Sequence, residues 1–140
     1  MSSIPPLLRR RLRAESNAPC CAYCHSPEKL LGIPLEADHI TSVSLGGKTL
    51  IANLCLCCRT CNGYKWQITK ARDPLTNRLV KLFHPRRQSW PEHFQWDAGA
   101  TRIVGLTATG RATIEGLQMN NELMVNLRSL WVILELHPSE

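Results

Sequence analysis

Short apolar runs separated by turn residues divide this chain of 140 residues. Clustered or alternating apolar positions predict five short strands, at residues 35–40, 53–57, 79–83, 93–96 and 103–106. The glycine pair Gly46-Gly47 marks a loop over residues 42–48, between the first two strands. The first part of the chain therefore has a strand–loop–strand pattern, and three further strands follow it.

Helical spacing of apolar residues adds four helices to these strands. In the first, over residues 7–15, Leu7, Leu8 and Leu12 fall near one face and arginines occupy the others. The second covers about residues 59–72 and ends before the Asp73-Pro74 step. Together with the strands, these helices predict an α+β protein.

The last two helices follow candidate capping residues. Thr107 or Thr109 is placed to begin a helix that continues through Leu117, and Asn121 is placed to begin the final one. Apolar residues line a single face of the final helix: Leu123, Leu127, Leu130, Trp131 and Leu134. We expect this part of the chain to be structural, covering the sheet or a partner subunit.

Composition narrows the class of protein. A hydrophobic content of 44% favours a packed globule over a disordered chain. No apolar run approaches the roughly twenty residues that span a bilayer, and the opening of the sequence lacks the apolar stretch of a signal peptide. We therefore expect a cytoplasmic protein with no membrane partner, in which the cysteines are reduced.

The formal net charge of +6 is unevenly placed. Residues 1–87 contain 14 Lys and Arg against 5 Asp and Glu, a formal +9, whereas residues 88–140 contain 3 against 6, or −3. A basic surface attracts phosphate backbones without reading sequence. We assign phosphate contact to a cluster on the first helix: Arg9, Arg10, Arg11 and Arg13. A helix that merely packs its leucines on the core is an equally good interpretation.

Four of the seven cysteines form two Cys-x-x-Cys pairs: Cys21 with Cys24, and Cys58 with Cys61. Four thiolates suit one tetrahedral Zn²⁺ with no open position, which makes the site structural rather than catalytic. The 33 residues between the pairs exceed the roughly 15–20 of a zinc ribbon, so a hairpin has been inserted into the metal frame. Three more cysteines lie next to the assigned ligands, so the assignment of the zinc ligands could be shifted by one residue: Cys20, Cys55 and Cys57. Small buried apolar residues are the commoner role for such cysteines.

Further motifs lie between and after the cysteine pairs in a fixed order. They are Asp38-His39-Ile40, Gly46-Gly47, Asn53-Leu54, and then Asn62 and Lys65 after the second pair. With the cysteines, this order resembles the HNH endonuclease family over roughly residues 19–70. Shorter motifs at residues 93–96, 105–107 and 110–113 are similar to the tail of small bacterial HNH proteins.

The resemblance implies an α+β fold with a ββα-metal core stapled by the four-cysteine zinc site. Residues 1–72 would hold the basic amino-terminal helix and this nuclease core. Residues 73–140 would form a carboxy-terminal α+β extension of short strands and two helices that packs on the core.

The resemblance also implies metal-dependent hydrolysis of DNA phosphodiester bonds. His39 is expected to be the general base that activates water, while Asn53 holds the histidine's loop by hydrogen bonds. Asp38 and Asn62 are expected to bind a catalytic Mg²⁺ or Mn²⁺ through oxygen atoms, and Lys65 to contact phosphate. The letters HNH stand for the residues of the family motif, and Asn62 takes the place of the final histidine. An amide oxygen is a weaker ligand than imidazole for softer metals, so the metal preference of a site with that histidine does not carry over.

Other interpretations stay open at this point. An Asp-His pair on a strand is more often structural than catalytic, until the surrounding motif is weighed. A zinc-stabilised module that binds nucleic acid without cutting it would also explain the basic charge, but it has no need of the Asp-His pair or of Asn62. The apolar face of the last helix fits a structural protein that interacts through it. Either a monomer or a homodimer agrees with the sequence.

Overall fold

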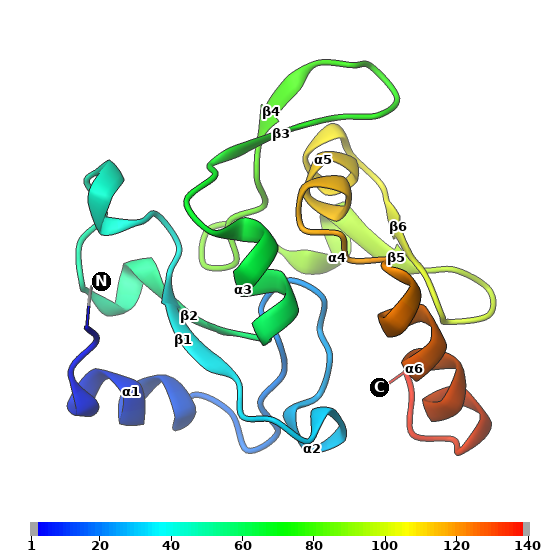
Figure 1. The fold of residues 1–140 in the computed structure, drawn as a ribbon, viewed down its shortest axis with the longest axis horizontal. Helices are drawn as coiled ribbons and strands as arrows, with labels where there is room; N and C mark the ends of the chain where they lie inside the picture. The colour runs from blue at the N-terminus through cyan, green and yellow to red at the C-terminus, as the bar shows by residue number, and fades with distance from the viewer. Residues whose placement is uncertain (1–2, 139–140) are drawn as a thin grey trace. The chain divides into compact units, whose positions relative to one another are not determined.

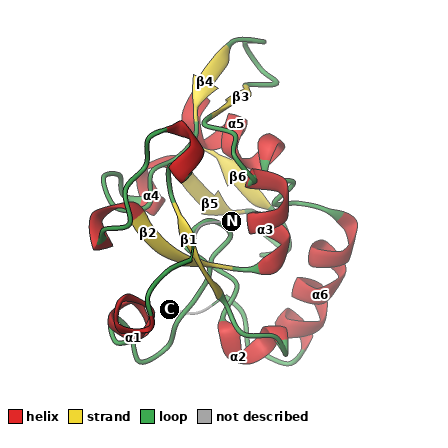
Figure 2. Ribbon diagram, turned by 60° about the vertical axis from the view of Figure 1, so that its left-hand side comes forward, coloured by secondary structure: helices red, strands yellow, loops and turns green. Residues whose placement is uncertain are grey.

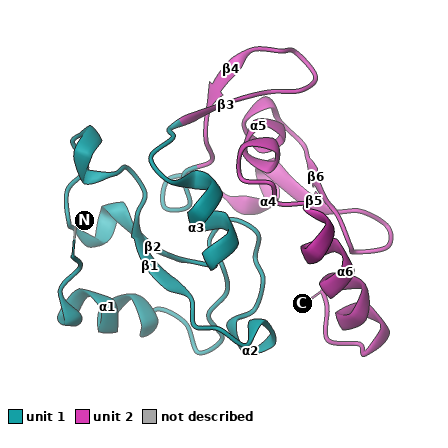
Figure 3. Cartoon of the chain, in the orientation of Figure 1, with its two compact units in different colours: residues 1–69, 84–87 teal, residues 70–83, 88–140 magenta. Residues whose placement is uncertain are grey.

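The computed structural model describes residues 3–138, drawn as a ribbon in Figure 1. Short strand pairs and helices make up the chain, as Figure 2 shows, which confirms the predicted mixture of α and β elements. The chain divides into two compact units, coloured separately in Figure 3. Unit 1 comprises residues 1–69 and 84–87, and unit 2 comprises residues 70–83 and 88–140. The domain ranges 1–72 and 73–140 stay a prediction, and their ends at residues 1–2 and 139–140 lie outside the described residues.

Unit 1 is built around one β-hairpin and the helix that follows it. Its elements are α1 (Pro6–Arg13), α2 (Glu28–Leu31), β1 (Glu36–His39), β2 (Leu54–Cys57) and α3 (Arg59–Lys65). β1 and β2 are antiparallel, with Asp38 opposite Cys55 and His39 opposite Leu54. The first two predicted strands are therefore present, each slightly shorter than the apolar pattern indicated.

The core of unit 1 forms where α1 packs on β2. Ile4, Leu12 and Leu54 are buried together, and Leu8 packs against them. Leu7 is exposed and does not share the buried face with Leu12. Residues four apart lie on one stripe of a helix, which puts Leu8 and Leu12 toward β2 and turns Leu7 away from it.

A later segment, residues 84–87, completes unit 1. The Nε atom of Arg86 donates a hydrogen bond to the carbonyl of Leu54 at 2.9 Å. Its two terminal nitrogens donate to the carboxylate of Glu15, at 2.9 and 2.8 Å. One guanidinium thus fixes the chain after α1 against the start of β2.

Helix α3 ends at Lys65, so the predicted helix over residues 59–72 is wrong in its second half. Trp66 leaves the helical conformation at φ +40° and ψ −111°, and its N–H closes the last turn on the carbonyl of Asn62. Lys70–Arg72 instead forms β3, which pairs with β4 (Leu79–Lys81). The hydrogen bonds between β3 and β4 outweigh continuation of the helix, because the preceding residues Ile68 and Thr69 are β-branched and have weak helical preference.

Unit 2 contains two antiparallel hairpins and three helices within its described residues. β3 pairs with β4, and β5 (Phe94–Trp96) pairs with β6 (Ile103–Gly105). The helices are α4 (Trp90–His93), α5 (Ala108–Gly116) and α6 (Glu122–Ile133). α5 packs against both hairpins, as can be followed in Figure 1. The predicted strands and the last two predicted helices are therefore present.

The ends of α5 and α6 follow the predicted capping chemistry. Thr107, rather than Thr109, caps α5 by accepting a hydrogen bond from the N–H of Gly110. Asn121 caps α6 by accepting from the N–H of Met124. Only glycine fits at position 110, because a Cβ atom there would lie 2.1 Å from the carbonyl oxygen of His93.

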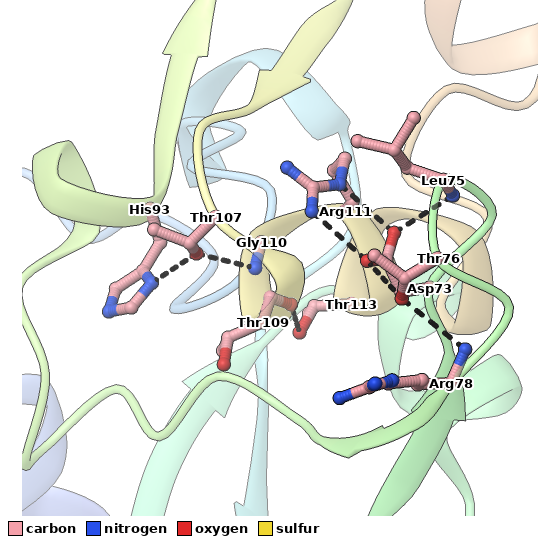
Figure 4. A network of polar contacts seen from close by, with 10 residues as sticks. All are labelled: Asp73, Leu75, Thr76, Arg78, His93, Thr107, Thr109, Gly110, Arg111 and Thr113. Carbon is pink, nitrogen blue, oxygen red and sulfur yellow. Dashed lines mark hydrogen bonds and ion pairs between the residues drawn. The ribbon is translucent and has the colours of Figure 1, made fainter.

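A polar network joins the β3–β4 hairpin to α5 (Figure 4). Arg111 donates two hydrogen bonds to the buried carboxylate of Asp73, at 2.9 and 3.0 Å. The same carboxylate accepts from the N–H of Leu75 and the hydroxyl of Thr76, which holds the hairpin turn. The Arg111 guanidinium keeps the pKa of Asp73 well below its usual range. The network therefore stabilises unit 2 in the charged state of Asp73.

The buried face of α6 differs from the predicted one. Met124, Arg128 and Trp131 are buried, whereas the exposed apolar residues include Leu123, Leu130 and Leu134. The guanidinium of Arg128 donates to the carbonyls of Thr101 and Met119 and lies 5.3 Å from the ring centre of Trp96. These polar contacts turn the face with Arg128 inward, which hydrophobic spacing alone does not predict.

Candidate active site and metal centre

Four buried thiols gather in unit 1. The Sγ atoms of Cys21, Cys24, Cys58 and Cys61 all lie within 4.8 Å of one another. Those of Cys24 and Cys58 are 3.7 Å apart. A tetrahedral Zn²⁺ with bonds of about 2.3 Å places its thiolates about 3.8 Å from each other. The cluster fits one such ion in size and donor type, and the predicted grouping of these four cysteines is confirmed.

Backbone hydrogen bonds shape the two turns that present these thiols. In the first turn, the N–H of Cys21 donates to the carbonyl of Ser26, and the N–H of His25 donates to the carbonyl of Cys21. In the second, Cys58 is the N-cap of α3, and its Sγ accepts from the N–H of Cys61 at 3.4 Å. Because α3 begins at this turn, whatever holds the thiols also fixes the residues that follow on α3.

The other three cysteines lie outside the cluster. Cys20 is half-buried beside the first turn, whereas Cys55 and Cys57 are buried on β2. A hydrogen bond with Cys55, together with burial, raises the pKa of the Cys57 thiol. Burial raises the pKa of the Cys20 thiol. Cys20, Cys55 and Cys57 do not belong to the group of thiols that lie close enough together to hold one ion, which removes the alternative register and agrees with small apolar roles.

An open groove of about 540 Å³ lies along β1 and α3. Three residues predicted to act in catalysis line it: Asp38, His39 and Asn62. β1 and α3 are neighbours in both ribbon views (Figures 1 and 2). Adjacent strand residues normally point to opposite faces, but β1 ends at His39, and both members of the Asp-His pair border the same groove.

The imidazole of His39 is held at one nitrogen. The side chain is largely buried, with 7% of the residue exposed. Its Nε2 atom lies 2.9 Å from the hydroxyl of Thr49, which can donate or accept depending on the tautomer. Thr49 was not predicted, because a threonine after a glycine turn carries no distinctive signal. The contact fixes the ring at the edge of the groove.

Asn53 ties down the loop that follows His39. Its Oδ1 accepts from the N–H of Thr41, and its Nδ2 donates to the carbonyls of Thr41 and Lys48, all at 2.9 Å. Gly47 allows this close packing, since a Cβ atom there would lie 1.8 Å from the carbonyl oxygen of Thr41. Gly46 supplies the turn itself, at φ +92°. The glycine pair is therefore explained by the loop geometry alone.

Two charged residues of the groove, Glu36 and Arg59, were not singled out by the sequence analysis. Glu36 accepts a hydrogen bond from Nδ2 of Asn62 at 3.0 Å, which orients the amide and leaves Oδ1 as its acceptor atom. Arg59 lies 3.9 Å from the same carboxylate and is well exposed. Glu36 stands two residues before Asp38 on β1, so the alternation of the strand was the signal that would have placed both carboxylates together.

Lys65 is buried beside the Asp-His pair. Only 2% of the residue is exposed. Its Nζ atom donates to the carbonyl of His39 at 3.0 Å and to Oδ2 of Asp38 at 3.3 Å. Burial and these two contacts leave the ammonium group little surface for a polyanion, and phosphate contact by Lys65 stays a prediction. Its observed contacts position the Asp-His pair instead.

The arginines of α1 are all exposed but differ in their partners. Arg13 pairs with the carboxylate of Glu28, with one distance of 2.6 Å. Nε of Arg9 donates to the carbonyl of Ile4 at 2.9 Å. None of the four lines the groove. Phosphate contact therefore stays a prediction for all four arginines: Arg9, Arg10, Arg11 and Arg13. The alternative interpretation, a helix that packs leucines on the core, is met by Leu8 and Leu12 and does not exclude such contact.

Comparisons with known proteins identify one segment. Residues 21–66 match the family model described as HNH endonuclease. The match begins at the first thiol of the cluster, ends at Trp66 and spans the whole groove-forming hairpin, which confirms the predicted resemblance for this segment. No curated protein and no solved structure matched the chain. Within the described residues, the helices are all too short or too polar to cross a membrane.

Proposed function

We propose that this protein is a metal-dependent endonuclease that hydrolyses phosphodiester bonds of DNA in the groove of unit 1. One observation carries the proposal. Asp38, His39 and Asn62 line a single groove, and all three lie inside the segment that matches the HNH endonuclease model. A module that only binds nucleic acid has no need for a carboxylate, an imidazole and an amide on one surface.

His39 is the proposed general base. Hydrolysis of a phosphodiester requires an in-line nucleophile and a group that takes its proton, and imidazole does so near neutral pH. The contact between Nε2 and the Thr49 hydroxyl at 2.9 Å holds the ring in place at the groove and leaves Nδ1 as the other ring nitrogen. Asn53 supports the same geometry by closing the loop from Thr41 to Lys48 with three hydrogen bonds.

Asp38 and Asn62 are the proposed ligands of the catalytic divalent ion. A carboxylate and an amide oxygen are hard donors, which suits Mg²⁺ or Mn²⁺. When bound, such an ion neutralises charge on the transferring phosphate and the leaving oxygen. The ammonium group of Lys65 donates to Oδ2 of Asp38, and the carboxylate of Glu36 accepts from Nδ2 of Asn62 and so orients the amide. Each proposed ligand thus has a partner that fixes its side chain before the ion arrives.

We interpret β1, β2 and α3 as a ββα-metal unit stapled by structural Zn²⁺ at the four cysteines. The thiol cluster agrees in spacing with a tetrahedral ion, and its last member, Cys61, directly precedes Asn62. The zinc would therefore set the position of Asn62, and loss of the structural ion would disturb the catalytic one.

The proposed partner is DNA. The residues of unit 1 include 10 Lys and Arg against 4 Asp and Glu, a formal +6, and Arg59 is an exposed cation on the rim of the groove. Such a surface draws in the phosphate backbone and makes binding dependent on salt. Arg10 and Arg11 on α1 are further exposed cations of unit 1, outside the groove.

The test is cleavage of supercoiled plasmid by zinc-loaded protein in the presence of Mg²⁺, Mn²⁺ or neither ion. We expect nicking or linearisation that requires the divalent ion and disappears in His39→Ala, while that variant stays folded at the assay temperature and still binds DNA. A contaminating nuclease would be indifferent to the substitution. DNA binding without cleavage under every ion would overturn the proposal in favour of a zinc-stabilised binding module.

A further inference from the structure

The groove carries an aromatic side chain that no step of hydrolysis uses. Trp66 lines the groove on the side of α3. It is 71% exposed, and no other large apolar side chain of unit 1 is more exposed within the described residues. Tryptophan is usually well buried, because its large ring contributes strongly to the packing of a core. Trp66 therefore does little for the core of unit 1.

The backbone of Trp66 also departs from what a bulky residue prefers. Its dihedrals, φ +40° and ψ −111°, lie near those of the first central residue of a type II′ turn, about +60° and −120°, where glycine dominates. The turn is held on both sides, because the N–H of Trp66 donates to Asn62 at 2.9 Å and the N–H of Ile68 donates to Lys65 at 2.8 Å. Strain of this kind costs stability and concentrates at functional sites.

We infer that Trp66 stacks on a nucleobase, and that the groove takes DNA in which a nucleotide beside the scissile phosphate is unpaired. The inference deepens the proposed function and rests on it. A tryptophan ring that is exposed, held in a glycine-type turn and placed on the rim beside Asn62 is suited to receive a flat ligand. Aromatic side chains in nucleic-acid channels stack on bases in this manner, with little dependence on sequence.

Stacking limits the form of the DNA. In a duplex both faces of each base are covered by neighbouring bases, so a protein ring reaches a base face only where the strand is single, frayed, gapped or flipped out. Val43 is also exposed and lines the groove, which gives the rim a second apolar contact for a base. In this arrangement Arg59 attracts the phosphate backbone, and Trp66 selects an unpaired base.

The test is binding in the His39→Ala background, so that no strand is cut during the measurement. The probes are a single-stranded oligonucleotide and the fully paired duplex of the same sequence, each at one fixed salt concentration. We expect Trp66→Ala to raise the Kd for the single strand about 5- to 150-fold and to leave the Kd for the duplex unchanged. Trp66→Phe should keep most of the affinity, because it keeps a π face.

Two controls separate stacking from folding. Tyr64 is 50% exposed on α3, two residues before Trp66, but does not line the groove, so Tyr64→Ala should leave both affinities unchanged. Trp66→Gly should lose single-strand affinity and yet raise the melting temperature, because glycine suits the turn. Equal losses on both probes, no loss on either, or a Trp66→Gly variant that melts lower would overturn the inference.

The same experiment distinguishes this inference from the proposed function. If the Trp66-dependent preference for single strands is present but wild-type protein cuts no DNA under any ion, stacking stands and the nuclease proposal fails. If wild-type protein cuts DNA and Trp66→Ala binds both probes as before, the nuclease proposal stands and stacking fails.

Discussion

Replacing Lys65 by methionine tests whether this buried side chain supports the site or contacts DNA. Methionine has a similar length and no charge. Two contacts of Nζ are lost, at 3.0 Å to the carbonyl of His39 and at 3.3 Å to Asp38. A buried carbonyl left without a donor costs about 1–3 kcal/mol. The ion pair adds about 1 kcal/mol, because the side chain of Asp38 is partly exposed.

The expected loss for Lys65→Met is therefore about 2–4 kcal/mol, which lowers the melting temperature by about 6–16 °C at roughly 3–4 °C per kcal/mol. Thermal unfolding followed by circular dichroism with zinc in excess measures this shift. Lys29→Met is the matched control. Lys29 is exposed on α2, so its replacement should stay within about 0.5 kcal/mol of wild type.

DNA binding gives the result that would refute this reasoning. If Lys65 only positions Asp38 and His39, the slope of log Kd against log salt is unchanged in Lys65→Met at temperatures where the variant is folded. If Lys65 contacts phosphate, the slope decreases in size by about 0.9 for that one contact. A reduced slope together with an unchanged melting temperature would support the assignment from the sequence.

Three more predictions address other parts of the structure. Removing zinc with a chelator should abolish hydrogen-exchange protection in β1 and β2 but not in α5, because unit 1 has a small apolar core; protection retained in β1 would contradict the staple. Asn53→Ala should lower cleavage far more than DNA affinity and increase proteolysis within residues 41–48, because the three hydrogen bonds that hold this loop are lost. Proteolysis at the wild-type rate would show that the loop does not depend on these bonds. Asp73 has a lowered pKa, so its stabilisation is complete above the unfolded value near 3.9 and is lost as the pH falls further. Asp73→Asn should flatten that acid-side loss of melting temperature, and an unaltered profile would exclude this role.

Local chemistry was the part of the fold that sequence predicted well. The spacing of two Cys-x-x-Cys pairs predicted the thiol cluster, because a metal site constrains residue type and distance along the chain together. The caps Thr107 and Asn121 were predictable for a similar reason, since an oxygen three residues before a free N–H is a local arrangement.

Tertiary choices were not predictable in the same way. α3 stops at Lys65 because the chain beyond it pairs with β4, and no local signal announces that partner. The inward face of α6 is set by the contacts of Arg128 with distant carbonyls, against the run of exposed leucines. The contacts of Lys65 with Asp38 and His39 were also not predictable, because a lysine in sequence does not reveal whether its ammonium group is buried.

The most direct test of the central claim is the chemistry of the ends that the protein makes. Plasmid is incubated with zinc-loaded protein and Mg²⁺ in ¹⁸O-labelled water under single-turnover conditions, and the ends are analysed by mass spectrometry. Hydrolysis by an activated water predicts one ¹⁸O atom in each new terminal phosphate and no labelled ends from His39→Ala. Intact DNA with wild-type protein, or labelled ends that His39→Ala still produces at the wild-type rate, would contradict the assignment of His39 and the groove as the site of hydrolysis.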